Sequence, residues 1–316
     1  MKKFLWKLLL LLSLCTLALL LLTLVTFHVA APQHRGMYNA AIADKVARLE
    51  SLDSPKIILA GDSNLAFGID SAKIEEAFGM PVVNLGGHGA LGTIFHLNMA
   101  KSNIQPGDIV IVSNTTYAST GVVDPSIMWI TIENDPDLRS MVAPQDTFKM
   151  LKALPKYLVK TLLCWVTGTG NQPGEDAYSI TAFNEYGDNV FPRPVTTQYV
   201  FREGYVNPPP ISDAGMQVIN DFAAYCTQQG AVCLLAAEPV ACNPETVPVE
   251  AFAAFDETLR QQAQCDVISS YPDYLMDHTL FFDQPSHLTD SGIQLRTQQL
   301  IEDLQTWMEG NPDRLQ

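Results

Sequence analysis

Positive charge is scarce in this chain of 316 residues. It has 19 lysine and arginine residues against 34 aspartate and glutamate residues, which gives a formal net charge of −15. The first 31 residues hold three lysines and no acidic residue, so the remainder carries −18. A surface this acidic repels the phosphates of nucleic acids, and the sequence contains no basic stripe to offset it. We therefore expect no nucleic-acid partner.

The chain also lacks internal repeats, low-complexity tracts, and the cysteine or histidine spacings of a zinc site. The sequence thus indicates neither a metal nor a cofactor. Its hydrophobic content of 47% suits a globular body with one very apolar segment.

Charge of either sign is absent from Leu8 to Ala31, directly after three lysines. The core of a signal peptide has about 7–15 apolar residues, whereas a membrane span needs about 20. We therefore predict a single-pass anchor over residues 1–31. Lysines before the run and none directly after it predict a cytoplasmic N-terminus and an extracytoplasmic body. A long signal peptide that is cleaved is the alternative.

Five of the six cysteines lie beyond this anchor, on the side where disulfides persist. Because five is an odd number, at least one thiol would stay free or pair outside the chain. The pairs Cys226/Cys233 and Cys242/Cys265 are plausible because their members are near in sequence. Buried free thiols are the alternative.

The rest of the chain divides into three predicted parts. Residues 32–54 are expected to form a juxtamembrane helix or linker, with Ile42, Val46 and Leu49 on one face. Residues 55–316 form the main domain, in which strands at 56–60, 81–86, 107–114, 231–240 and 265–270 alternate with helices at 71–79, 91–103, 212–230, 248–264 and 288–310. This alternation predicts a parallel sheet with helices on both sides.

An irregular insertion at about 117–210 interrupts that alternation. It is expected to contain a helix over 146–168, kinked or broken at Pro155, and then a long ordered loop. Such a loop in a compact domain is usually functional, and we interpret it as a lid or a substrate wall.

Ser63 stands where the first predicted strand ends, in the sequence Gly61-Asp62-Ser63. All three residue types favour turns, which is the simpler explanation. Ligands of parallel sheets, however, bind outside the carboxyl ends of the strands. Ser63 is therefore a candidate nucleophile.

Asp283 and His287 lie in a proline-broken loop just before the last predicted helix. A serine hydroxyl needs a base within hydrogen-bond reach, and histidine suits because its pKa lies near neutral pH. A carboxylate can then orient the imidazole. The alternative for His287 is a polar residue ahead of a helix cap at Thr289.

Two further strand ends offer hydrogen-bond donors for an oxyanion. Gly89 lies in a glycine-rich turn after the second strand, and Asn114 ends the third strand. Plain turn chemistry and a strand-ending residue are the alternatives. Gly89 and Asn114 share with Ser63 a position at the end of a strand, so we group the three residues. The N–H of Ser63 is then a third donor.

This order of blocks resembles the SGNH (GDSL-type) hydrolase superfamily. Ser63 in "GDSN", Gly89 in "NLGGHG", Asn114 in "SNT" and His287 in "DQPSHL" match its four blocks. The sequence departs from the family pattern in three ways. Asn64 separates Ser63 from Leu65, so the common Gly-Asp-Ser-Leu is shifted by one residue. The third block lacks its usual Gly-Asn-Asp, and Asp283 and His287 are four residues apart where three is common. The resemblance implies a three-layer α/β/α sandwich with a flavodoxin-like sheet, and hydrolysis or transfer of ester acyl groups.

With its anchor, the chain is similar to the bacterial cell-surface branch of that superfamily, which includes proteins of exopolysaccharide O-acetylation and teichoic-acid D-alanylation. We expect an esterase that acts on O-acyl groups of cell-envelope glycans. One alternative is an O-acyltransferase that works with a membrane-bound O-acyltransferase partner. Others are a non-catalytic glycan-binding protein on the same fold, and an anchored scaffold with an accidental Gly-Asp-Ser.

Overall fold

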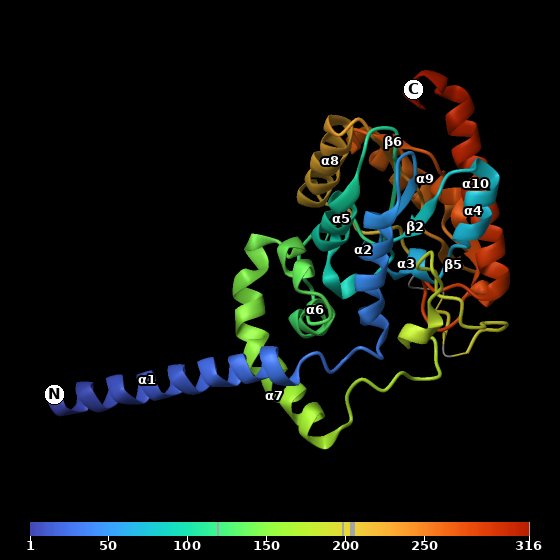
Figure 1. Cartoon of the computed structure of the whole chain (residues 1–316). Coiled ribbons are helices and arrows are strands. Elements are labelled where there is room, and N and C mark those ends of the chain that lie inside the picture. The colour runs from blue at the N-terminus through green and yellow to red at the C-terminus, as the bar shows by residue number, and fades with distance from the viewer. Residues whose placement is uncertain (119, 198, 203–205, 316) are drawn as a thin grey trace.

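Five parallel strands form the central sheet of the protein. They are β1 (Ile57–Gly61), β2 (Val82–Asn84), β3 (Ile109–Ser113), β4 (Val232–Leu235) and β6 (Asp266–Val267), arranged in the order β2-β1-β3-β4-β6. Counted along the chain this is the order 2-1-3-4-5, which is common in doubly wound sheets. The computed structural model describes residues 1–118, 120–197, 199–202 and 206–315 (Figure 1). The predicted α/β class with a parallel sheet is confirmed.

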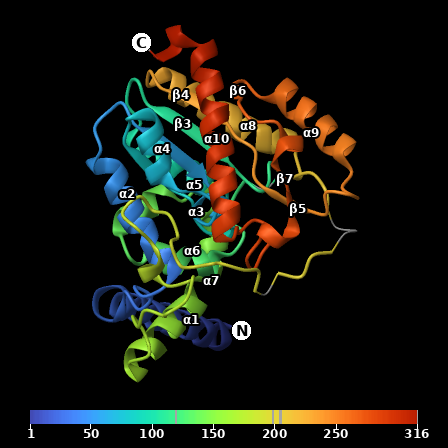
Figure 2. The same ribbon diagram turned by 90° about the vertical axis from the view of Figure 1, so that its right-hand side faces the viewer.

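Apolar clusters cover both faces of this sheet, because alternate strand residues point to opposite sides. Ile58 and Val110 belong to one cluster, and Ile57 and Ile109 to the other. The first cluster is completed by α2 (Ala41–Ser51), α5 (Thr93–Ala100), α8 (Asp213–Gln228) and α9 (Val249–Gln262). The second is completed by α4 (Ser71–Phe78) and α10 (Asp290–Gly310), and Figure 2 shows α10 lying in front of the sheet.

The N-terminal helix α1 (Lys2–Val25) continues into a π-helical segment, η1 (Thr26–Ala30), and projects from the body (Figure 1). The segment Lys2–Ala30 is long and apolar enough to cross a membrane, which fits an anchor or a signal sequence. Its body end packs on α6 (Pro125–Ile132) and α7 (Thr147–Thr167), where the Phe27 ring lies 5.8 Å from the rings of both Trp129 and Tyr157.

The juxtamembrane helix is α2, and it packs into the body. The face that the sequence predicted, with Ile42, Val46 and Leu49, is buried in the first of the two apolar clusters. Its Lys45 is buried as well and donates to the backbone oxygens of Gly86 and Gly187, both at 2.6 Å. The second of these bonds ties the insertion to the body.

The structure adds detail to three of the expected elements. Asp70 caps α4, because its side chain accepts from the Lys73 N–H, while the Ser71 hydroxyl donates to Asp188. The strand expected at 231–240 ends early, before Pro239, and a short β5 (Val240–Cys242) pairs with β7 (Leu275–Asp277) in a separate sheet. Pro155 lies inside α7, so of the two expectations, a kink or a break, the break does not occur.

All six cysteines are free thiols. Neither Cys226/Cys233 nor Cys242/Cys265 is bridged, so the predicted pairing is wrong for this structure. Cys226, Cys233 and Cys242 are buried, as the alternative of buried thiols expected.

Candidate active site

Ser63 occupies the first position of the short helix α3 (Ser63–Ala66), directly after β1. Asp62 caps this helix by accepting from the Asn64 N–H at 3.0 Å. The turn requires glycine at position 61, because a Cβ there would lie 2.0 Å from the backbone oxygen of Ser113 on the neighbouring strand. The serine is thus held at the carboxyl end of the sheet, as predicted.

The structure brings Ser63, His287 and Asp283 together in one chain of hydrogen bonds. His287 Nε2 lies 2.9 Å from Ser63 Oγ, and His287 Nδ1 lies 2.9 Å from Asp283 Oδ1. The backbone N–H of Leu288 donates to the Phe67 oxygen at 3.2 Å, which fastens the histidine loop to the end of α3. The four-residue spacing of Asp283 and His287 is therefore compatible with a direct contact.

The His287 ring is buried and its orientation is fixed by a stacked aromatic ring. Phe67 lies parallel to it, with ring centroids 3.8 Å apart and an interplanar angle of 5°. The guanidinium group of Arg193, itself fully buried, lies 4.9 Å from the Phe67 centroid. These contacts restrict the imidazole to the plane in which it faces Ser63.

Tyr178 is a fourth member of the hydrogen-bonded series Ser63–His287–Asp283, and the sequence did not reveal it. Its hydroxyl donates to Asp283 Oδ2 at 2.6 Å and accepts from Gln284 Nε2 at 3.1 Å. Burial of Asp283 acts to raise the pKa of its carboxyl group, but the hydrogen bonds from His287 and Tyr178 outweigh it and leave this pKa below its usual value. Tyr178 comes from the insertion at 117–210, so that segment does contribute a wall of the site.

Gly89 and Asn114 border the same region. Gly89 lines a cavity of about 210 Å³ together with Ser63 and His287, and Asn114 lines an adjoining cavity of about 130 Å³ that also includes Gly89. Among the described residues, no acceptor contacts the N–H groups of Ser63 and Gly89 or the buried Nδ2 atom of Asn114. Three donors without an acceptor in the described part of the chain therefore border two adjoining cavities, one of which contains the serine hydroxyl.

A buried arginine supports this end of the sheet, and the sequence gave no sign of it. Arg296 of α10 donates from Nη2 to Asn64 Oδ1 at 2.6 Å and to Ser113 Oγ at 3.2 Å. Burial lowers the pKa of Arg296 to about 10, so its guanidinium group still carries its charge at neutral pH. Asp62 Oδ2 in turn accepts from the Thr115 N–H at 2.8 Å, which links the serine turn to the end of β3.

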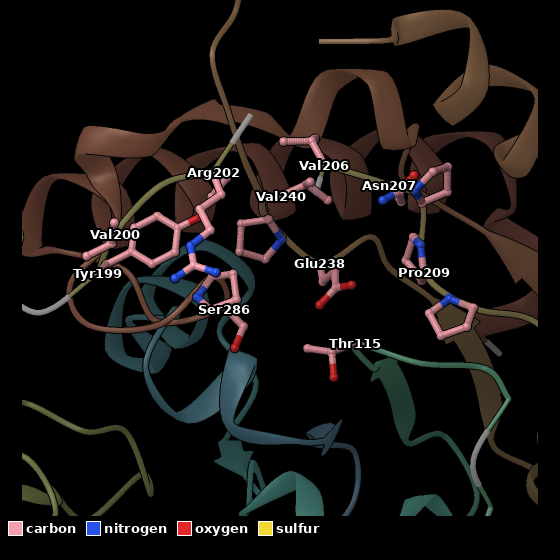
Figure 3. Close-up of a pocket in the computed structure, with 15 residues that line it drawn as sticks. Thr115, Tyr199, Val200, Arg202, Val206, Asn207, Pro209, Glu238, Val240 and Ser286 are labelled. Carbon is pink, nitrogen blue, oxygen red and sulfur yellow. The ribbon is translucent and has the colours of Figure 1, made fainter. Parts of the chain in front are cut away.

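A cavity of about 430 Å³, whose lining residues are drawn in Figure 3, lies next to the one that contains Ser63 and His287. Thr115 and Ser286 line both this cavity and the one that contains Ser63 and His287. The Glu238 carboxyl group points into it.

Serine hydrolases of unrelated folds use the same parts for acyl transfer: a nucleophile, a base and a carboxylate in this order, with hydrogen-bond donors nearby. No protein-family model matches this chain, and no curated protein is significantly similar to it. The arrangement equips Ser63 to attack a carbonyl carbon, and the spacing of its partners suits proton transfer at the leaving atom.

Proposed function

We propose that this protein is a serine acyl-ester hydrolase of the SGNH type, which acts on O-acyl groups of cell-envelope glycans. The observation that carries the proposal is the hydrogen-bonded chain from Ser63 through His287 to Asp283. The strand order and the apolar clusters on both faces of the sheet support a flavodoxin-like, three-layer α/β/α assignment. We assign α1 as a single-pass anchor, with its lysines in the cytoplasm and the body outside.

In the proposed mechanism, Ser63 Oγ attacks the ester carbonyl carbon while His287 Nε2 takes its proton. The oxyanion accepts hydrogen bonds from the N–H groups of Ser63 and Gly89 and from the Asn114 amide. His287 then gives the proton to the leaving alcohol as the carbon–oxygen bond breaks, which leaves an acyl group on Ser63. Water attacks this acyl-enzyme with His287 as base, releasing a carboxylic acid and the free serine. Asp283 orients the imidazole throughout.

The acyl group we propose is short. The cavity of about 130 Å³ lies on the side of the oxyanion donors. This volume is less than a third of that of the cavity beside it, which favours a small acyl group such as acetyl.

Transfer of the acyl group to a sugar hydroxyl would use the same residues, with the hydroxyl taking the place of water. The large cavity beside the triad favours this as a second candidate, because it can hold an acceptor. A membrane-bound O-acyltransferase would then be the partner that supplies the acyl group.

A fluorophosphonate probe tests the proposed nucleophile. We expect the full-length chain in detergent to be labelled, with the adduct on the peptide that contains Ser63, because the probe reacts only with activated serines. The Ser63→Ala variant should lose the label. The Ser286→Ala variant should keep it, because Ser286 lines the same cavity but its hydroxyl takes no part in the hydrogen bonds of the His287 ring. A wild-type chain that stays unlabelled, while folded, would contradict the proposal and favour a glycan-binding role.

A further inference from the structure

The cavity of about 430 Å³ beside the triad falls in the size range of ligand sites, which is about 300–1,000 Å³. Its walls come from the loop after β4, from the late insertion and from the histidine loop. Ser286 lies beside Tyr199 and Arg202 at one side of the cavity, Asn207 and Pro209 lie at the other, and Glu238 and Thr115 lie between them (Figure 3). Pro208, Pro209 and Pro210 form an apolar wall.

Glu238 is the unusual member of this lining. Its side chain is only 7% exposed, and its carboxyl group points into the cavity between Val240 and Thr115 (Figure 3). Nothing in the described part of the chain donates a hydrogen bond to this carboxyl group or forms an ion pair with it. Buried polar groups are normally satisfied, so a carboxyl group left open toward a cavity points to a ligand.

The charge state of Glu238 suits a hydroxyl partner better than a cation. Burial raises the pKa of its carboxyl group well above the usual value, and the nearby Asp62 carboxylate adds to this, while Arg296 opposes it. A protonated carboxyl group can both donate a hydrogen bond and accept one, as a sugar hydroxyl also can.

The position of the cavity assigns it to the alcohol side of the ester. The carbonyl oxygen must face Gly89 and Asn114, where the small cavity lies. The leaving oxygen must lie near His287, which protonates it, and Ser286, the neighbour of His287, lines the large cavity. The alcohol part of the substrate therefore extends from His287 toward Glu238.

We propose that this cavity binds the alcohol moiety of the ester, a sugar or a similar polyol, and that Glu238 forms a hydrogen bond with one of its hydroxyl groups. Tyr199 and the proline wall offer apolar surface to the C–H face of the ring. This inference rests on the proposed function, because it presupposes that Ser63 is the nucleophile.

Two esters with the same acyl group test the assignment in the full-length protein. One is p-nitrophenyl acetate, whose alcohol carries no aliphatic hydroxyl, and the other is a mono-O-acetylated methyl glucoside. We expect Glu238→Leu to lower kcat/KM about 10-fold or more for the sugar ester, and less than about 3-fold for the aryl ester, since only the first loses a hydrogen bond in a buried site. Glu245→Gln, an exposed glutamate of the following turn, is the matched control and should change neither.

Equal losses on both esters would overturn the inference, because they would indicate a structural role for Glu238. An unchanged kcat/KM on both esters would overturn the inference too. A loss confined to p-nitrophenyl esters of longer acids would also overturn it, because it would show that the cavity binds the acyl group. If the wild-type chain hydrolyses neither ester, the proposed function fails. Saturation-transfer NMR with methyl glucoside then tests separately whether the cavity binds a sugar. We expect binding to the wild type and loss of binding in Glu238→Leu.

A second, independent observation concerns the outer face of α7. Phe148, Leu151, Val159, Leu163 and Val166 recur at spacings that place them on one side of the helix, and their exposed fractions run from 58% to 78%. The buried residues of the helix, among them Tyr157 and Leu158, pack against α6 and the end of α1. An apolar stripe of this size in water is unusual for a folded body.

Lysines flank that stripe. Lys149, Lys152, Lys156 and Lys160 are exposed, and the helix contains no acidic residue, although the chain as a whole is strongly acidic. Figure 1 shows α7 crossing the body end of α1, on the side from which α1 projects. With α1 in a bilayer, α7 would therefore lie along its surface.

We infer that α7 is an interfacial helix, which inserts its apolar stripe among lipid acyl chains while its lysines contact anionic headgroups. This does not depend on the proposed catalysis. The test uses the full-length chain in nanodiscs that contain a phospholipid with a photoreactive acyl chain. We expect crosslinks on the peptides of α7 and none on α8, another helix at the surface of the body.

Leu163→Glu/Val166→Glu should lower the α7 crosslinks several-fold, whereas Gln217→Glu on α8 should leave them unchanged. Replacing anionic lipid by neutral lipid should weaken them. Absence of α7 crosslinks while α1 is labelled would overturn the inference. Protection of the stripe only in the presence of a second membrane protein would assign it to a protein partner and overturn it as well.

Discussion

Replacement of His287 by glutamine is expected to lower kcat/KM for a short-chain ester by about 10⁴-fold or more. Glutamine cannot take the Ser63 proton, so the hydroxyl would remain a weak nucleophile. The rest of the site should persist, because Phe67, Asp283 and the backbone bond from Leu288 stay in place. Steady-state kinetics on p-nitrophenyl acetate measures the effect, and circular dichroism checks that the variant is folded.

His278→Gln is the matched control for this prediction. His278 lies in the same stretch of chain, follows an aspartate, and stacks on Phe201 with ring centroids 4.4 Å apart. It makes no contact with Ser63, so its replacement should leave kcat/KM within about 3-fold of the wild type. Comparable losses in the two variants would mean that the whole loop, and not the imidazole of His287, governs the rate.

A second large effect is expected far from the site, at the amino end of the sheet. Lys56 and Asp108 are both fully buried, and Lys56 Nζ lies 2.7 Å from Asp108 Oδ2. Asp108→Ala should lower the free energy of unfolding by about 3–5 kcal/mol, because it leaves an ammonium group buried without its partner. Denaturant unfolding of the full-length protein, followed by tryptophan fluorescence, measures the loss.

Two comparisons sharpen that test. The double variant Lys56→Met/Asp108→Leu should regain part of the stability, since both charges leave together, while the N–H groups of Lys56 and Gln105 still lose their acceptor. Lys73→Ala removes an exposed ion pair with a separation of 4.0 Å to Asp70, and should cost less than about 1 kcal/mol. If Asp108→Ala lowered the free energy of unfolding as little as Lys73→Ala, the prediction would be wrong, and water would have to reach the buried Lys56.

The residues predicted at strand ends are those that a local rule can find. Ser63, Gly89 and Asn114 each follow an apolar run, and parallel strands carry such positions to one edge of the sheet. His287 could be predicted because the proposed chemistry needs a base and because it stands before a helix cap. Their roles in catalysis remain predictions, while their proximity is described by the structure.

The residues that the sequence did not reveal all act through contacts distant in the chain. Tyr178 reaches Asp283 across 105 positions, and Arg296 reaches Asn64 across 232. No periodicity marks such partners, because a tyrosine in a loop or an arginine in a helix usually faces water. Glu238 was missed for a similar reason, since the strand expected through Val240 would have made it an ordinary strand residue.

The backbone bond between Leu288 and Phe67 has a consequence for the synthesis of the protein. It joins the histidine loop to the serine helix, and the hydrogen-bonded Ser63 and His287 are separated by 224 positions. A nascent chain therefore contains Ser63 long before His287, and the two side chains can meet only once nearly all of the polypeptide has been made. If Ser63 is the nucleophile that we propose, incomplete translation products would carry it without its base.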